Sequence, residues 1–421
     1  MGRLKPASVS ICLILAAAVI ASVRTETQTA QAATTLFEGA RLIVGDGTAP
    51  IENAAFIVQG NRFAQVGRRG ELKAPAGAAR VDLAGKTVMP GIVDTHAHLA
   101  NERAAIIDQL QHKAYYGVAA VTSLGQDAGD LPFQIRSEVI PGAALFRTAG
   151  RGITSPEPGR SEVPYWVKSE PEARKAVQEL AAKKVDLVKI WVDDRDGKYQ
   201  KLSPAIYRAV IDEAHKNKLR VTAHIFGLED AKDLLRAGID GFAHGVRDKD
   251  VDDEFVALIK KRPDVFLVPN LPDPGVAADL SWLSATVPDA ELKKMQAAAT
   301  DRPAVQQAFG IQARNLARLN KEGVRIALGT DGAAPWAHHQ EMADMVAAGM
   351  TPAEVIVAST RTAADVLRLS QLGTIANGKS ADFIVLDANP LENITNTRRI
   401  ASVYLRGAAL DRSAMAAKWK K

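Results

Sequence analysis

The sequence has almost no cysteine, because its one thiol, Cys12, lies near the N-terminus and the rest of the chain has none. Aromatic residues make up only 5% of the chain, and no basic stripe alternates with them. A formal net charge of +5 over 421 residues is too small to favour nucleic acid or an anionic membrane surface. The sequence therefore predicts a protein that is stabilised by a packed core without disulfides and has no nucleic-acid partner.

The chain also lacks an apolar run of the ~20 residues needed to span a bilayer. Arg3 and Lys5 precede a shorter apolar run, residues 11–23, and Ala30-Gln31-Ala32 supplies the small-residue pattern of a cleavage site. We therefore expect residues 1–32 to be a secretory signal peptide, with an uncleaved membrane anchor as the alternative. After cleavage the protein would be periplasmic or secreted and would have no stable membrane span.

Short runs of alternating apolar and polar residues occur in two separated parts of the chain. Residues 33–90 contain several such runs, divided by Gly45-Asp46-Gly47 and Gly60-Asn61, which are typical of hairpin turns. The pattern returns in residues 369–421, the second part together with a C-terminal tail. We expect the two parts to form one small, discontinuous β-sandwich domain with an antiparallel sheet.

Residues 91–368 alternate between strand-like and helix-like segments. Helix starts are indicated at Ser169 and at Ser203-Pro204. Eight candidate strands end near Asp94, Leu124, Thr148, Trp191, Phe226, His244, Pro269 and Thr330. This pattern predicts an α/β fold, a TIM (β/α)8 barrel, whose active site lies at the carboxyl ends of the strands. An open doubly wound sheet is the competing architecture.

The segment GIVDTHAHL, residues 91–99, ends an apolar run in two histidines with one residue between them. Side chains of a strand alternate with period two, so His96 and His98 would point to the same side. Two such imidazoles are half of a metal site, although a lone pair of histidines can also be solvated or structural. Four later candidate strands end in further potential ligands, namely Lys189, His224, His244 and Asp331.

A lysine is a poor metal ligand as a cation, because it has three donors and no acceptor. If the amine of Lys189 reacted with carbon dioxide, the resulting carbamate would offer two anionic oxygens to two metals. Its apolar neighbours in LVKIW make a buried ammonium costly. The alternative is an ordinary lysine at a strand end, paired with Asp193 or Asp194.

This ligand set, in this order and on these strands, resembles the amidohydrolase superfamily in its binuclear branch with a carboxylated lysine. VDLAGKTVMPGIVDTHAHL and GTIANGKSADFIVLDANPLENI add to the likeness, which covers nearly the whole chain after the leader and is nearest to imidazolonepropionase-like proteins and exported metallo-dipeptidases. The resemblance implies that His96, His98 and Asp331 hold one metal and that His224 and His244 hold the other. Lys189, carboxylated, would bridge them.

The resemblance implies a metal-dependent hydrolase of amide or peptide bonds that uses a metal-activated hydroxide. Asp331 is the ligand suited to moving the proton to the leaving group. Zinc is favoured by the imidazole-rich donors, with manganese, iron and cobalt as alternatives. A dipeptide, an N-acyl amino acid or a cyclic amide would be the small substrate. A lactone or ester hydrolase and a catalytically silent exported metal-binding protein are the competing interpretations.

Contacts to substrate are harder to assign from the sequence, because the loops after strands three and four differ from those of the dipeptidases. Arg247 is the first candidate to hold an anionic group, and Arg195 the second, although nearby aspartates could pair with both. Trp191 and His339 are further candidates at the mouth of the barrel. The thirty residues after Asn270 form either a binding loop or a surface elaboration. Assembly into a homo-oligomer is left open.

Overall fold

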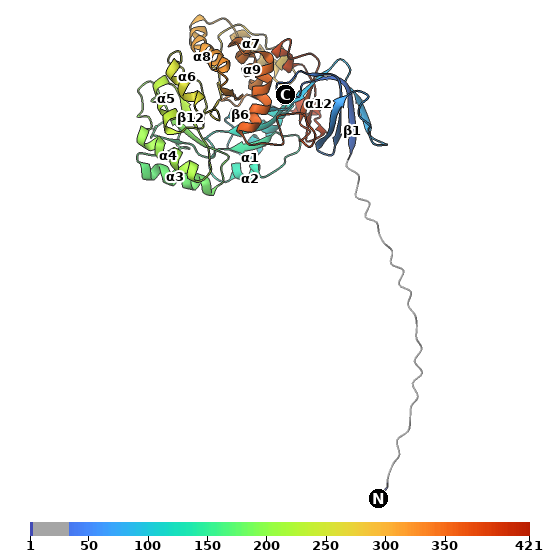
Figure 1. Cartoon of the computed structure of the whole chain (residues 1–421), viewed down its shortest axis with the longest axis horizontal. Helices are drawn as coiled ribbons and strands as arrows, with labels where there is room; N and C mark the ends of the chain where they lie inside the picture. Colours follow the sequence, from blue (N-terminus) through green and yellow to red (C-terminus); the bar gives the residue numbers. More distant parts are fainter. Residues whose placement is uncertain (3–32) are drawn as a thin grey trace. The chain divides into compact units, whose positions relative to one another are not determined.

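A computed structural model describes residues 1–2 and 33–421 of the chain (Figure 1). The chain separates into two units, Met1–Ala32 and Ala33–Lys421, and the following description concerns the second. The predicted signal peptide lies, apart from its first two residues, outside the described residues. Among the residues that are described, no helix is long and apolar enough to cross a membrane.

The N- and C-terminal segments form one mixed sheet of eight strands, in the order β18-β17-β16-β5-β1-β2-β3 with β4 beside β1. The two segments share this sheet because β5 pairs with β16. The expected antiparallel pattern is only partly right, since β1 pairs in parallel with β4 and β5. The strands are β1 (Thr34–Leu42), β2 (Ile51–Gln59), β3 (Arg62–Arg68), β4 (Ala79–Asp82), β5 (Thr87–Pro90), β16 (Phe383–Leu386), β17 (Ile400–Leu405) and β18 (Ala408–Ala409).

Aromatic side chains of this sheet meet across strands that are not neighbours in the hydrogen-bonded order. Phe63 of β3 and Phe383 of β16 have ring centroids 5.7 Å apart, and Phe37 of β1 lies 5.3 Å from Phe383. The backbone N–H of Phe63 also donates to the carbonyl of Lys379, just before β16. The sheet therefore curls until its β3 side approaches the start of β16, and the rings fill the space between.

The central segment contributes two sheets in which every strand pair is parallel. All residues of β6, β7, β11 and β12 are buried, as expected for parallel strands covered on both faces. The first sheet has the order β6 (Ile92–Ala97), β7 (Val118–Ser123) and β8 (Leu145–Thr148). The second has the order β10 (Tyr165–Trp166), β9 (Ile153–Thr154), β11 (Val188–Val192), β12 (Val221–Ile225), β13 (Gly241–Phe242), β14 (Phe266–Leu267) and β15 (Arg325–Ile326).

Backbone hydrogen bonds connect the two parallel sheets on both sides. The N–H of Thr95 in β6 donates to Leu328 just after β15 (3.0 Å), and the N–H of Thr330 donates to His96 (2.8 Å). On the other side, the N–H of Asp186 before β11 donates to Thr148 of β8 (3.0 Å). All predicted strand ends lie within a few residues of observed strands, whereas the short strands β9 and β10 were not predicted.

Most helices follow the strands in alternation, and α3 to α6 succeed one another around the outside of the region that contains β12 (Figure 1). The predicted starts are confirmed, because Ser169 and Ser203 accept bonds from the N–H groups of Glu172 and Ile206 as helix N-caps. The α-helices are α1 (Arg103–Tyr115), α2 (Leu131–Arg136), α3 (Glu170–Ala182), α4 (Pro204–Lys216), α5 (Leu228–Ala237), α6 (Asp253–Lys260), α7 (Asp289–Ala298), α8 (Pro303–Lys321), α9 (Ala337–Ala347), α10 (Pro352–Val357), α11 (Ala363–Val366) and α12 (Arg412–Trp419).

Three short helical segments complete the structure. A 3-10 turn, η1 (Ser281–Leu283), and helix α7 lie within the long connection between β14 and α8, which is therefore not structureless. A π-helical segment, η2 (Ala358–Thr362), joins α10 to α11, and a further 3-10 turn is η3 (Ile394–Arg398).

Candidate active site

The two histidines of the first motif converge on Asp331, as the alternation of side chains along β6 predicted. Nε2 of His96 and Nε2 of His98 each lie 3.0 Å from Oδ1 of Asp331. Asp331 follows β15 with a φ of +53°, and its backbone N–H donates to the carbonyl of His96 (2.7 Å). One donor atom from each of the three residues lies within 4.8 Å of the others, which makes this group a candidate for holding one metal ion.

His224, within β12, and His244, two residues after β13, extend this group. Nε2 of His244 lies 3.5 Å from Oδ2 of Asp331, and the His244 ring centroid is 5.3 Å from that of His96. The rings of His224 and His244 are 4.5 Å apart. The structure thus brings together four histidines and one carboxylate from β6, β12, β13 and the segment after β15.

Burial sets the protonation of these groups. Removal from water lowers the pKa of His96 to about 4 and that of His224 to about 3, and the pKa of His244 is lowered as well. Burial alone would raise the pKa of Asp331, but the nearby histidines outweigh it and hold that pKa below its usual value. The site therefore offers neutral imidazoles at His96, His224 and His244 and an ionised carboxylate at Asp331, the forms that bind metals.

Lys189 lies in β11 with no exposed surface, and its Nζ has no hydrogen-bond partner among the described residues. Burial lowers its pKa to about 7. The alternative of a pair with Asp193 or Asp194 is not found, because Asp193 contacts Arg195 and His224, and Asp194 accepts from a backbone N–H. Burying an amine without a hydrogen-bond partner costs free energy, and a further group bound to Nζ would reduce that cost.

Trp191, two residues further along β11, lies beside Lys189, with Nζ 5.4 Å from its ring centroid. Only 5% of Trp191 is exposed, and its ring packs against Gly125 and Gly152. A Cβ at Gly152 would lie 2.0 Å from the ring, so only glycine fits there. Trp191 is therefore a buried neighbour of Lys189. Its contact with substrate stays a prediction.

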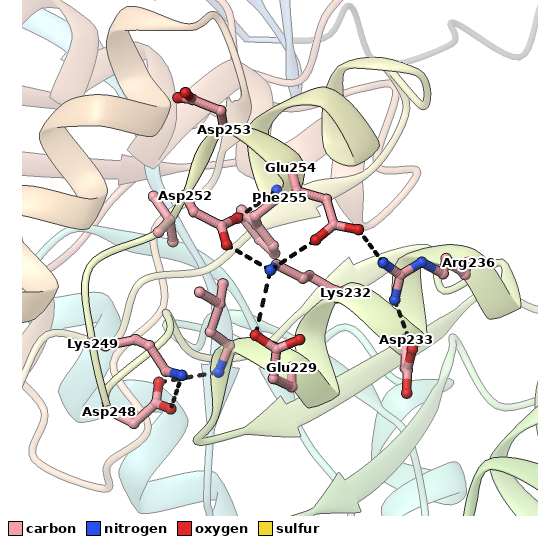
Figure 2. A network of polar contacts seen from close by, with 12 residues as sticks. Glu229, Lys232, Asp233, Arg236, Asp248, Lys249, Asp252, Asp253, Glu254 and Phe255 are labelled. Carbon is pink, nitrogen blue, oxygen red and sulfur yellow. Dashed lines mark hydrogen bonds and ion pairs between the residues drawn. The ribbon is translucent and has the colours of Figure 1, made fainter.

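Arg247 does not form the expected ion-pair network with the four aspartates that follow it. Those carboxylates are engaged elsewhere, and Figure 2 shows Asp252 beside Lys232 together with Glu229 and Glu254. The remaining partners are Leu228 N–H for Asp248, Arg314 for Asp250 and Arg318 for Asp253. Nη2 of Arg247 instead contacts Nδ1 of His244, and its Nε is buried with no hydrogen-bond partner among the residues that the structure describes.

Arg195 pairs with a nearby aspartate, which is the alternative to a substrate contact that the sequence left open. Its guanidinium donates to Oδ2 of Asp193 (2.6 Å) and lies 2.9 Å from Nε2 of His224 and 3.4 Å from Oε1 of Glu157. Both arginines therefore face the histidines, but only Arg247 is without a carboxylate partner within ion-pair distance in the described part of the chain.

His339 lies in α9, where its ring nitrogens contact the hydroxyl of Thr397 (3.1 Å) and the carbonyl of Tyr116 (3.0 Å) rather than the metal-ligand candidates. Its exposed fraction is 1%, so the expected place at the pocket mouth is wrong. The adjacent His338 is fully buried and also contacts the carbonyl of Tyr116.

Two polar residues that the sequence analysis did not assign support the site. Oδ1 of Asn270 lies 2.9 Å from Nδ1 of His96, and Asp94 accepts bonds from Lys113 (3.0 Å) and the Thr330 hydroxyl (2.9 Å). Asp94 is part of the VDTHAHL motif, and Asn270 ends the strand-like run VFLVPN. A polar residue at the end of a candidate strand was the signal that could have identified both.

Similarity to known proteins identifies the family of this chain. The family model "Amidohydrolase family" matches residues 87–410. The chain belongs to the amidohydrolase family. Its members are generally metal-dependent, in agreement with the group of His96, His98 and Asp331.

Similar amidohydrolases include an imidazolonepropionase from Deinococcus radiodurans, 29% identical over 394 residues, which cover 86% of this chain and 92% of the relative. An ochratoxinase from Aspergillus niger is 26% identical over 463 residues, covering 93% and 87%. The solved structure of phenylurea hydrolase B has the same fold, with a TM-score of 0.75 at 23% identity, and the match covers 91% of this chain and 98% of that one. These relatives indicate a hydrolase that acts on carbon–nitrogen bonds.

Proposed function

We propose that this amidohydrolase is a binuclear metal enzyme that hydrolyses the amide or peptide bond of a small substrate, such as a dipeptide, an N-acyl amino acid or a cyclic amide. The observation that carries the proposal is the convergence of His96, His98, His224, His244 and Asp331. The buried Nζ of Lys189 interacts electrostatically with Asp331, His96 and His224 and has no hydrogen-bond partner among the described residues. We also propose that the protein belongs to the subgroup that contains imidazolonepropionase-like proteins and exported metallo-dipeptidases.

We also propose that the two parallel sheets of the central segment form one closed TIM barrel. The hydrogen bonds from Thr95 to Leu328 and from Asp186 to Thr148 connect the two parallel sheets at both sides, which supports a closed (β/α)8 arrangement. The curl that brings Phe63 to Phe383 supports a sandwich-like domain over 33–90 and 369–421 beside the barrel domain, 91–368.

The donors fit two divalent ions. His96, His98 and Asp331 would hold one, His224 and His244 the other, and Lys189 would bridge them as a carbamate formed when its neutral amine adds to carbon dioxide and releases a proton. Arg195 and Arg247 surround Lys189 with positive charge, which would stabilise the anionic carbamate. Imidazole-rich sites suit zinc. The metals would supply Lewis acidity to the scissile carbonyl and to the attacking water.

The chain's own residues would complete the reaction. Asp331 would accept the proton of the attacking water on a carboxylate oxygen and deliver it to the leaving nitrogen, so that the amide is cleaved to a carboxylate and an amine. Asn270 would keep His96 oriented through Nδ1. Arg247 would hold an anionic group of the substrate with its free Nε. Export through the 1–32 leader, to the periplasm or outside, completes the proposal.

The test uses residues 33–421 loaded with zinc and a panel of dipeptides, N-acyl amino acids, cyclic amides and lactones. We expect amide hydrolysis that is lost in His98→Ala and kept in His215→Asn, a histidine bonded to Asp240 elsewhere. Turnover of lactones alone would instead favour the ester hydrolase. No turnover with two metals bound would favour the silent metal-binding protein.

A further inference from the structure

The connection between β14 and α8 forms one wall of a cavity of about 510 Å³. Apolar side chains dominate the wall: Leu271, Val276, Leu280, Trp282 and Met295 come from the connection, and Trp336 faces them from the loop before α9. Cavities of this size and lining hold small organic ligands in other proteins. The connection is thus not structureless, and it provides most of the apolar wall of this cavity.

None of the six metal-ligand candidates lines the cavity, but two of its lining residues are chain neighbours of residues in the candidate site. Thr330 lines it and immediately precedes Asp331, while its hydroxyl donates to Asp94. Leu271 also lines it and immediately follows Asn270, which contacts His96. A substrate whose reacting bond lies at Asp331 would therefore place one of its neighbouring groups in this cavity.

The charged groups of the cavity disfavour an anion. The guanidinium of Arg302 is already paired with Asp273. At the α9 side, Glu341 accepts from the N–H of Leu271 (3.1 Å) and Asp344 accepts from Gln340 (2.8 Å), and both carboxyls are buried. Burial raises the pKa of both, that of Asp344 to about 7. An anion there would lie against apolar side chains and would find no unpaired cation among the residues that line the cavity.

We propose that this cavity binds an uncharged, apolar side group of the amide substrate, aromatic or branched aliphatic, next to the scissile bond. This inference rests on the proposed function. The reacting amide of the substrate would then lie at Asp331, and its apolar group would pack against Trp282 and Trp336. Residues of the β14–α8 connection would determine which substrates are hydrolysed.

The test compares three amides that differ in one side chain: N-acetylphenylalaninamide, N-acetylglycinamide and the α-amide of N-acetylaspartic acid, whose side-chain carboxylate is free. Hydrolysis by the zinc-loaded protein is followed by acetate and ammonia release, and binding to the metal-free protein by calorimetry. Burial of a phenyl group predicts a kcat/KM for the phenylalanine compound about tenfold or more above that of glycine, and aspartate below both.

Val276→Asp is the decisive variant, because Val276 lines the cavity with 49% of its surface exposed and a charge there leaves the core intact. We expect it to lower kcat/KM for the phenylalanine compound about tenfold and to leave the glycine compound within about twofold. The matched control is Val139→Asp, which is 66% exposed and lines a different cavity, and it should change neither value.

The two proposals fail separately. Hydrolysis of all three amides at equal kcat/KM, or an unchanged phenylalanine preference in Val276→Asp, would overturn the apolar cavity and leave the amide hydrolase standing. Selective calorimetric binding of the phenylalanine compound, lost in Val276→Asp, without any hydrolysis would support the cavity and overturn the proposed reaction. Absence of both binding and hydrolysis would overturn both.

Discussion

Oδ1 of Asn270 lies 2.9 Å from Nδ1 of His96, and this contact joins the long β14–α8 connection to the first metal-ligand candidate. With Nδ1 donating its proton to the amide oxygen, the lone pair of Nε2 points toward Asp331, the direction in which a metal would bind. The side chain that orients the histidine and the wall of the apolar cavity are therefore consecutive residues, Asn270 and Leu271.

Removal of the Asn270 acceptor should weaken metal binding. Asn270 has a φ of +44°, which glycine adopts without strain, so Asn270→Gly removes the side-chain oxygen and preserves the backbone. We expect zinc affinity, measured by competition with a chelator, to fall about 10–100-fold. Asn270→Asp keeps an acceptor and should retain the affinity. Equal affinities for the two variants would mean that the contact does not orient His96.

Asp331→Asn should separate proton transfer from folding. Its φ of +53° is tolerated by asparagine, so the loop after β15 should keep its shape. Loss of a general base predicts a fall in kcat of about 10²–10⁴, with a smaller change in KM. Metal content is measured in parallel, because the carboxylate also contacts His96 and His98. Near-normal turnover with full metal content would assign the proton transfer to another group.

The convergence of the four histidines and Asp331 could be predicted from the sequence because strand alternation and strand ends are local properties, whereas their role as metal ligands stays a prediction. His96 and His98 follow from period two in β6, and the other ligands follow from parallel strands that end on one side. The environment of each side chain is not local. Arg247 is followed by four aspartates, yet these pair with residues of α5, α8 and the backbone, partners that only the tertiary fold brings near.

His339 is a second residue whose surroundings could not be predicted from the local sequence. Its HxEM pattern lies close to Asp331 in the sequence, but α9 turns the ring toward Tyr116 and Thr397 in the interior. The parallel pairing of β1 with β4 and β5 was missed because alternation shows that a segment is a strand and does not show its partner.

Arg247→Met tests whether the guanidinium holds an anionic substrate group. The side chain is half-buried, contacts His244 and has no carboxylate partner within ion-pair distance in the described structure. We expect the variant to lose its preference for an N-acyl amino acid over the corresponding neutral amide. Arg314→Met, which removes an arginine paired with Asp250 of the same loop, is the control and should keep the preference. Equal losses on both substrates would mean that Arg247 supports the loop or His244 only.

Asp344 should make stability depend on pH. Burial, with a contribution from Asp273, raises its folded-state pKa from 3.8 to about 7, against the opposing effects of Gln340 and Arg398. The folded state therefore binds the proton more tightly than the unfolded state between these values, and the free energy of unfolding falls as pH rises from about 4 to about 7.

Asp344→Asn should reduce that fall and be more stable than the wild type at pH above about 7. Urea unfolding at a series of pH values measures both effects. Asp130→Asn, at a side chain that is 80% exposed, serves as the control. Parallel pH profiles for the wild type and Asp344→Asn would show that Asp344 is not the responsible group.

Lys189 is fully buried, and its Nζ has no hydrogen-bond partner in the described part of the chain. We propose that it bridges two metals as a carbamate. The most direct measurement is the metal content of wild type and Lys189→Ala after loading in bicarbonate, with turnover of the same samples and with acetate or propionate added as a substitute bridge. We predict two metals per wild-type chain, loss of metal and turnover together in Lys189→Ala, and partial recovery of both with the carboxylic acid. A Lys189→Ala protein that holds two metals tightly and retains full turnover would contradict the account.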